Sequence, residues 1–278
     1  MHERCELPRE ALQGRLERWA RQPAAAVAFD AVSSRILRAI RFHRSPVVRR
    51  VFFKLVVGFW RRIFRWFNRM KVTGLHHLPR GGAIFYANHP GQLDPLVLLA
   101  ALPADYPVPG CFIAWGNGYF MDLLEWAYGF VVSRAESRQL KVERMVRALL
   151  RHPFLAIWPE GHPTYHEGVE RGFSSVVDVY ATINARGDHV PFVPVLLRGT
   201  HVLRRETPIR PGPVEVHFFS PKFLPREELL PPELRGKTPR QVIDQLMSFL
   251  AKKAGQRSYA PNPRLEARWR RHGTRRNA

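Results

Sequence analysis

The chain is poor in cysteine and in acidic residues. Its 278 residues include two cysteines, Cys5 and Cys111, which excludes a disulfide framework and a cysteine-rich zinc site and is typical of a reducing compartment. Aspartate and glutamate number 23 against 44 lysines and arginines, so the formal net charge is +21. An excess of this size favours an anionic partner, such as nucleic acid, an anionic membrane surface or an acidic carrier protein.

The sequence also lacks a long apolar run and a recognisable secretory signal. Its most apolar stretch, VFFKLVVGFW at 51–60, is about half as long as a membrane-spanning helix and contains Lys54. The opening residues MHERCELPRE mix acids, bases and proline where the apolar core of a signal peptide would begin. We therefore expect neither a spanning helix nor a signal peptide, although a hydrophobic content of 45% predicts a substantial core.

Residues 47–70 predict a basic amphipathic helix. Between Arg35 and Lys71 the chain has twelve basic residues and no acidic one. A basic face opposite an apolar face that carries Trp and Phe predicts a helix lying in the interface of a membrane. The alternative is a helix that packs its apolar face on the domain and leaves its arginines in solvent. The predicted apolar stripe comprises Val48, Phe52, Leu55, Phe59, Ile63, Trp66 and Met70, and the basic face comprises Arg50, Lys54, Arg61, Arg65 and Arg69.

From residue 72 onward, short apolar runs alternate with helical patterns. Continuous apolar strands separated by helices predict an α/β fold, with a mixed, largely parallel sheet flanked by helices. A further helix is expected at 239–253, because Thr238 and Pro239 suit its N-cap and first position. The predicted strands are 83–87, 111–115, 130–133, 154–158, 192–197 and 214–219, and the helices between them lie near 95–102, 119–128, 136–151 and 172–185.

The segment NHPGQLDP at 88–95 directly follows the predicted strand 83–87. A turn followed by a helix starting at Pro95 could fold the carboxylate of Asp94 back onto the imidazole of His89. Such a pair consists of a general base and the group that orients it. The alternative is that Asp94 only caps the helix. The segment contains no serine or cysteine nucleophile, so the hydroxyl to be deprotonated would belong to a substrate and the transfer would be direct.

Three more motifs follow in order: YGFVVSR with Gly129 and Arg134, WPEGHP with Pro159, Glu160 and Gly161, and VPFVPVLL with Pro194. Together with NHPGQLDP they resemble the four sequence blocks of the glycerophosphate and lysophospholipid acyltransferase superfamily, over roughly residues 72–220. One departure stands out. His162 and Pro163 occupy the positions where the family usually has threonine and an arginine that holds the acceptor phosphate, so Arg171 or Arg134 would have to supply that contact.

The resemblance implies an enzyme that moves a fatty acyl group from acyl-CoA or acyl-ACP to a hydroxyl of a lysophospholipid. The best guess for the acceptor is 1-acylglycerol 3-phosphate, with glycerol 3-phosphate or another lysolipid as the alternative. No bound cofactor is expected. No metal is expected either, because His162 and His166 have neither a nearby cysteine nor helical ligand spacing. The implied catalytic residues are His89 and Asp94, and the implied substrate-binding residues are Asn88, Arg134, Glu160, Gly161 and Arg171.

Three parts of the chain are predicted: an N-terminal amphipathic, basic helical segment for membrane association at 1–71, an α/β acyltransferase domain at 72–256, and a basic, flexible tail at 257–278. The expected location is the cytoplasmic face of a membrane, held peripherally or monotopically, with an anionic membrane surface as partner. A nucleic-acid-binding protein would explain the charge but not NHPGQLDP or WPEGHP, so no nucleic acid is expected. A non-catalytic lipid-binding relative is the third possibility, because the third motif is altered.

Overall fold

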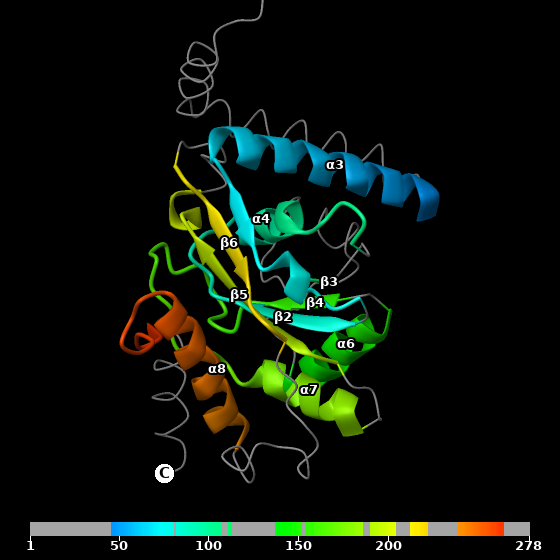
Figure 1. The fold of residues 1–278 in the computed structure, drawn as a ribbon. Helices are drawn as coiled ribbons and strands as arrows, with labels where there is room; N and C mark the ends of the chain where they lie inside the picture. The colour runs from blue at the N-terminus through cyan, green and yellow to red at the C-terminus, as the bar shows by residue number, and fades with distance from the viewer. Residues whose placement is uncertain are drawn as a thin grey trace, which may run out of the picture.

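The computed structural model describes residues 46–80, 82–106, 111–112, 137–151, 154–185, 190–203, 212–221 and 238–263. The predicted elements at 1–45, 119–128 and 130–133 lie outside these ranges. Figure 1 shows a twisted sheet with helices on both of its faces.

The sheet has six strands in the order β1-β6-β5-β2-β4-β3. Neighbouring strands run parallel except β5 and β6, which are antiparallel. This arrangement confirms the predicted mixed, largely parallel sheet. The short edge strand β1 was not predicted, because three residues are too few to show an alternating pattern. The strands are β1 Lys71–Thr73, β2 Ala83–Ala87, β3 Cys111–Phe112, β4 Phe154–Ile157, β5 Phe192–Arg198 and β6 Glu215–Phe218.

The central strand β2 divides the core into two layers. All five of its residues are buried, and they alternate between the two hydrophobic clusters on either side of the sheet. Strands β4 and β5 flank β2 in parallel, so the carboxyl ends of all three lie at the same edge. In α/β folds this edge carries the loops that form functional sites.

Helices α3 and α4 pack on one face of the sheet, and α6, α7 and α8 pack on the other. Helix α8 begins as predicted: the hydroxyl of Thr238 accepts from the Gln241 N–H, and the Gln241 side chain accepts from the Thr238 N–H. The helices are α3 Pro46–Phe67, α4 Asp94–Ala101, α6 Arg138–Arg151, α7 Ser175–Ala185 and α8 Pro239–Lys253, with 3₁₀ turns at Leu75–His77 and Thr200–Val202.

Helix α3 has two apolar faces, and the stripe predicted from its sequence is one of them. Trp60, Phe64 and Phe67 are buried against the domain, and none of them belongs to the predicted stripe. From that stripe, Leu55 and Phe59 instead face outward with 67% and 55% of their surface exposed. None of the helices in the described ranges is long and apolar enough to cross a membrane.

Arg61 does not belong to the solvated basic face on which we placed it. Its Nε donates to the carbonyl oxygen of Ala100 at 3.0 Å, and its Nη2 donates to that of Leu102 at 2.6 Å. These carbonyls lie at the C-terminal end of α4, where helix carbonyls lack intrahelical partners and a cation is favourable. Arg61 therefore joins α3 to α4.

The first residues of the predicted flexible tail are part of the domain. The Ala260 N–H donates to Val169 O at 2.8 Å, and Ala260 O accepts from the Arg171 N–H at 2.9 Å. Asn262 has no exposed surface. The basic composition of 257–278 led us to place the boundary too early, because backbone pairing with a distant loop leaves no signal in composition. The rest of the predicted tail lies outside the described residues.

Candidate active site

Asn88 links the site to the neighbouring strand β5. It is buried, and its Nδ2 donates to Leu197 O at 2.9 Å while its Oδ1 accepts from the Leu197 N–H at 2.8 Å. Both polar atoms of the side chain are therefore engaged by the backbone of β5. In this structure Asn88 fixes where the chain leaves β2, and its predicted contact with substrate stays a prediction.

His89 and Asp94 form a hydrogen-bonded pair at the carboxyl end of β2. His89 Nδ1 lies 2.7 Å from Asp94 Oδ2, and the same oxygen accepts from the Gly91 N–H at 3.0 Å. Asp94 is completely buried, whereas the His89 side chain is 14% exposed. Asp94 is the first residue of α4 and Leu93 is the N-cap, so the idea that Asp94 caps a helix starting at Pro95 is wrong.

The carboxylate determines which nitrogen of His89 acts as a base. A carboxylate only accepts hydrogen bonds, so Nδ1 carries the hydrogen and Nε2 holds the free lone pair. Among the residues that the structure describes, no hydrogen bond engages Nε2. The ring of Trp158 lies beside the imidazole, with 5.3 Å between the ring centroids. The pair can thus accept a proton at Nε2 while Asp94 stabilises the resulting imidazolium.

Gly91 is required by the close approach of this loop to the 3₁₀ turn after β5. A Cβ atom at Gly91 would lie 2.0 Å from the carbonyl oxygen of Thr200, which is backbone and has little room to move. Any side chain at this position would therefore push the loop away from its neighbour. The glycine keeps the loop that carries His89 close to the end of β5.

Glu160 binds the backbone of His89 through its carboxyl group. Its Oε2 accepts from the His89 N–H at 2.6 Å, and its Oε1 accepts from the Glu170 N–H at 2.8 Å. Burial raises the pKa of Glu160 well above its usual value, the nearby Glu170 and Asp94 carboxyls raise it further, and the two N–H bonds oppose the shift. Both carboxyl oxygens are used inside the protein, so the geometry gives Glu160 a role in positioning His89. Its predicted contact with substrate stays a prediction.

The loop 160–171 also binds the backbone carbonyl of His89. The Thr164 N–H donates to His89 O at 2.8 Å, and the Tyr165 N–H donates to Pro90 O at 3.0 Å. Gly161 allows the loop to turn away from β4 with a positive φ of 73°, a region that side chains disfavour. Thr164 and Tyr165 were not predicted as site residues, because nothing in a single sequence shows backbone pairing between two loops.

His162 and His166 both face the carboxylate of Glu170. His162 Nε2 and His166 Nε2 each lie 3.4 Å from a different oxygen of that carboxylate, and His162 Nδ1 lies 3.0 Å from Glu160 O. Within the described part of the chain, no group of three or more His, Cys, Asp or Glu side chains is arranged to hold a metal ion. His162, which stands where the family usually has threonine, therefore lies in a cluster with His166 and Glu170 within the loop 160–171.

The structure bears on only one of the two arginines that were suggested as phosphate ligands. Arg171 binds Asp244 through two hydrogen bonds, Nε to Oδ1 at 3.2 Å and Nη2 to Oδ2 at 2.9 Å. A phosphate would have to compete with this two-point ion pair, which makes Arg171 a poor substitute for the missing arginine. Arg134 lies outside the described residues, so its predicted contact with substrate stays a prediction.

Comparison with known proteins agrees with the motifs. Residues 69–198, which include His89, Asp94 and Glu160, match the model of the family described as Acyltransferase. This match confirms the resemblance predicted from the four motifs. No curated protein sequence matches the chain at a significant level.

A solved structure shares the fold. It is the crystal structure of the 1-acyl-sn-glycerophosphate (LPA) acyltransferase PlsC from Thermotoga maritima. The two chains are 19% identical, the alignment covers 89% of this chain and 96% of that one, and the TM-score is 0.62. At this identity the likeness establishes a common fold.

Proposed function

Because residues 69–198 match the acyltransferase family and enclose the His89–Asp94 pair, we propose that this protein is an O-acyltransferase of lipid synthesis. It moves a fatty acyl group from a thioester, acyl-CoA or acyl-ACP, to a hydroxyl of a lysophospholipid. The observation that carries the proposal is the 2.7 Å contact between His89 Nδ1 and Asp94 Oδ2, which leaves Nε2 as the base. The proposed acceptor is 1-acylglycerol 3-phosphate, with glycerol 3-phosphate or another lysolipid as the alternative.

The geometry supports direct transfer in one turnover. The acceptor hydroxyl donates its proton to His89 Nε2 as its oxygen attacks the carbonyl carbon of the thioester. Asp94 stabilises the imidazolium across the Nδ1 contact. The tetrahedral intermediate then collapses, the carbon–sulfur bond breaks, and the departing thiolate takes the proton from the imidazolium. The products are an ester and a free thiol, and His89 returns to its starting state.

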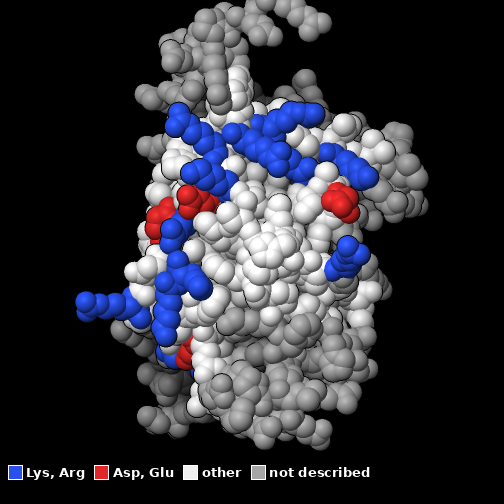
Figure 2. All heavy atoms as spheres, viewed as in Figure 1, with Lys and Arg blue, Asp and Glu red and all other residues white. Residues whose placement is uncertain are grey.

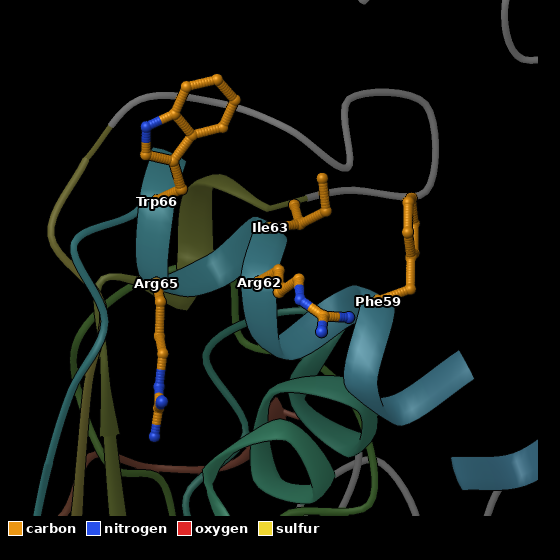
Figure 3. A pocket seen from close by; sticks show the side chains of 5 residues that line it. All are labelled: Phe59, Arg62, Ile63, Arg65 and Trp66. Atoms are coloured by element: carbon orange, nitrogen blue, oxygen red, sulfur yellow. The ribbon is translucent and has the colours of Figure 1, made fainter. Parts of the chain in front are cut away.

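We also propose that α3 places the enzyme on an anionic membrane surface at the cytoplasmic face. The outward face of α3 contains a shallow hollow of about 600 Å³, lined by Phe59, Arg62, Ile63, Arg65 and Trp66. Figure 3 shows Trp66 and Ile63 on one side of this face and Arg65 on the other. Figure 2 shows basic side chains gathered over the region of α3. Apolar side chains beside cations suit the boundary between acyl chains and anionic headgroups.

Replacing Leu55 and Phe59 together by serine is expected to weaken binding to anionic vesicles by at least about tenfold, because each fully buried side chain of this size contributes about 1.5–3 kcal/mol. The measurement is co-sedimentation of the full chain with vesicles that contain phosphatidylserine. Leu150→Ser is the matched control, since Leu150 on α6 is 51% exposed on the other side of the sheet. Equal loss of binding in the control, or none in the double variant, would remove α3 from the interface.

Surface substitutions are a better test of α3 than its deletion. Removing the helix would also remove Trp60 and Phe64, which are part of the domain core, and Arg61, which binds the end of α4. A deleted variant would then lose stability as well as any membrane contact, and the two effects would be mixed.

The proposed activity is tested by an acyl-transfer assay with a labelled thioester. Acyl-CoA and acyl-ACP serve as donors, and the acceptors are 1-acylglycerol 3-phosphate, glycerol 3-phosphate and a set of other lysolipids in vesicles. We expect labelled ester with at least one lysophospholipid. Absence of ester with every pair of donor and acceptor would refute the enzyme proposal and leave a lipid-binding protein.

A further inference from the structure

We infer that Asn262 is a positioning residue for His89 and acts through the loop 160–171. The inference rests on the proposed acyl transfer, in which His89 is the base. Asn262 lies after α8, in the segment that composition assigns to a flexible tail, yet its side chain has no exposed surface. A buried polar side chain in such a segment must satisfy its hydrogen bonds inside the domain.

The Asn262 amide joins two backbone carbonyls. Its Nδ2 donates to Glu160 O at 3.0 Å and to Arg171 O at 2.8 Å. Both partners are carbonyl oxygens, so the NH₂ group and not Oδ1 faces them, which fixes the orientation of the amide. Losing this donor would break the link between the two carbonyls: Glu160 O would keep its contact with His162 Nδ1, and Arg171 O would lose its hydrogen bond from the buried amide.

The two carbonyls belong to the two ends of the loop 160–171, so Asn262 links these ends, which we call the neck of the loop. One other contact joins the same two ends, and a second attaches the far end of the loop to the segment that holds Asn262. Glu160 Oε1 accepts from the Glu170 N–H, and Ala260 pairs with the backbone of Val169 and Arg171. The segment that holds Asn262 therefore runs along the far end of the loop and fixes it relative to β4.

The loop in turn holds His89 on both sides of its Cα. Glu160 Oε2 accepts from the His89 N–H at 2.6 Å, and the Thr164 N–H donates to His89 O at 2.8 Å. A shift at the neck would move both contacts together. Asn262 thus reaches the backbone of the catalytic histidine through one residue, Glu160, without contacting the imidazole.

Loss of the Asn262 amide should displace His89 without removing the base. Asp94 lies on the same segment as His89 and keeps its own contact with Nδ1. Because a displacement of about 1 Å at a catalytic group can cost about a hundredfold in rate, we expect kcat to fall by about 10- to 100-fold. KM for donor and acceptor should change by less than about threefold, because the Asn262 amide is directed at the backbone carbonyls of Glu160 and Arg171 and acts on the base through the loop.

The experiment compares full-length Asn262→Asp, Asn262→Ala and wild type. Aspartate keeps the shape of the side chain but turns a carboxylate oxygen toward the two carbonyls. Asn262→Ser, which keeps one donor, replaces the aspartate variant if that one does not fold. The matched control is Pro263→Ala, an exposed neighbour in the same segment. The readouts are kcat, KM, and amide hydrogen exchange across residues 88–95, with the β5 peptide as an internal reference.

The inference predicts a lower kcat, a nearly unchanged KM and faster exchange at 88–95 in the Asn262 variants, and no change in the control. An unchanged kcat with unchanged exchange would overturn it, and so would a raised KM with an unchanged kcat. If the wild type transfers no acyl group, the proposed function fails and hydrogen exchange alone decides. Faster exchange at 88–95 would then keep the positioning role, and unchanged exchange would refute it.

Discussion

Replacing His89 by alanine should lower kcat for acyl transfer by about a thousandfold, within the range of about 10²–10⁴ that a positioned general base contributes. The substitution removes Nε2, the atom that takes the proton of the acceptor hydroxyl. Folding should be largely retained, because the loop remains attached through the backbone of residue 89, which bonds Glu160 and Thr164. The measurement is the initial rate of ester formation, together with the thermal unfolding midpoint.

A histidine elsewhere provides the matched control. His76 lies exposed in the 3₁₀ turn Leu75–His77, which precedes β2, and His76→Ala should keep the wild-type rate. Vesicle binding should be equal in the wild type and in both variants, since neither change touches α3. Wild-type activity in His89→Ala would refute the mechanism, and an equal loss in both variants would show that the effect is not specific to the pair.

Asp94→Asn should have the second largest effect, a fall in kcat of about a hundredfold or more. The asparagine side chain has one oxygen where Asp94 Oδ2 now accepts from both His89 Nδ1 and the Gly91 N–H. If the oxygen stays there, the imidazolium still loses the negative charge that stabilises it. If the amide turns its NH₂ toward Nδ1, the imidazole changes tautomer and Nε2 no longer holds the lone pair.

The two residues should act as one unit in a double-mutant cycle. The double variant His89→Ala/Asp94→Asn is expected to be no slower than His89→Ala alone, because Asp94 works only through the imidazole. Asp178→Asn on α7 is the matched control, since Asp178 forms an ion pair with Arg138 at the surface. Additive losses in the double variant would assign Asp94 a role independent of His89.

The central strands could be predicted from the sequence because they are buried on both faces. AIFYA and FVPVLL appear as continuous apolar runs, and the structure places β2 and β5 there within a residue. The start of α8 was equally clear, since Thr238 and Pro239 suit the N-cap and first position of a helix, and the structure adds Gln241 as the third residue of a capping box. Signals of this kind involve neighbours in the chain and need no tertiary information.

The orientation of α3 could not be predicted in the same way. Its sequence carries apolar residues on two sides, and periodicity alone does not tell which side meets the domain. The structure buries Trp60 and Phe64 and leaves Leu55 and Phe59 outside. Burial on the domain and an exposed apolar face were posed as alternatives, and the described part of α3 shows both at once.

Within the site, contacts between residues close in the sequence were predicted, and contacts between residues far apart in the sequence were not. His89 and Asp94 lie in one short segment, so a turn could be seen to join them. The contact from Glu160 to the His89 backbone spans 71 positions, and the contact from Asn262 to Glu160 spans 102. The motif located Glu160, but only the fold shows that both of its carboxyl oxygens face the protein interior.

The most direct test of the account is to count free thiol and ester in the same reaction. Purified full-length protein is given a labelled acyl thioester, first without acceptor and then with lysophospholipid in vesicles. Direct transfer with His89 as the base predicts no label on the protein, no thiol release before the acceptor is added, and afterwards one thiol for each ester formed. Thiol release without acceptor, with label retained on the protein, would contradict this account.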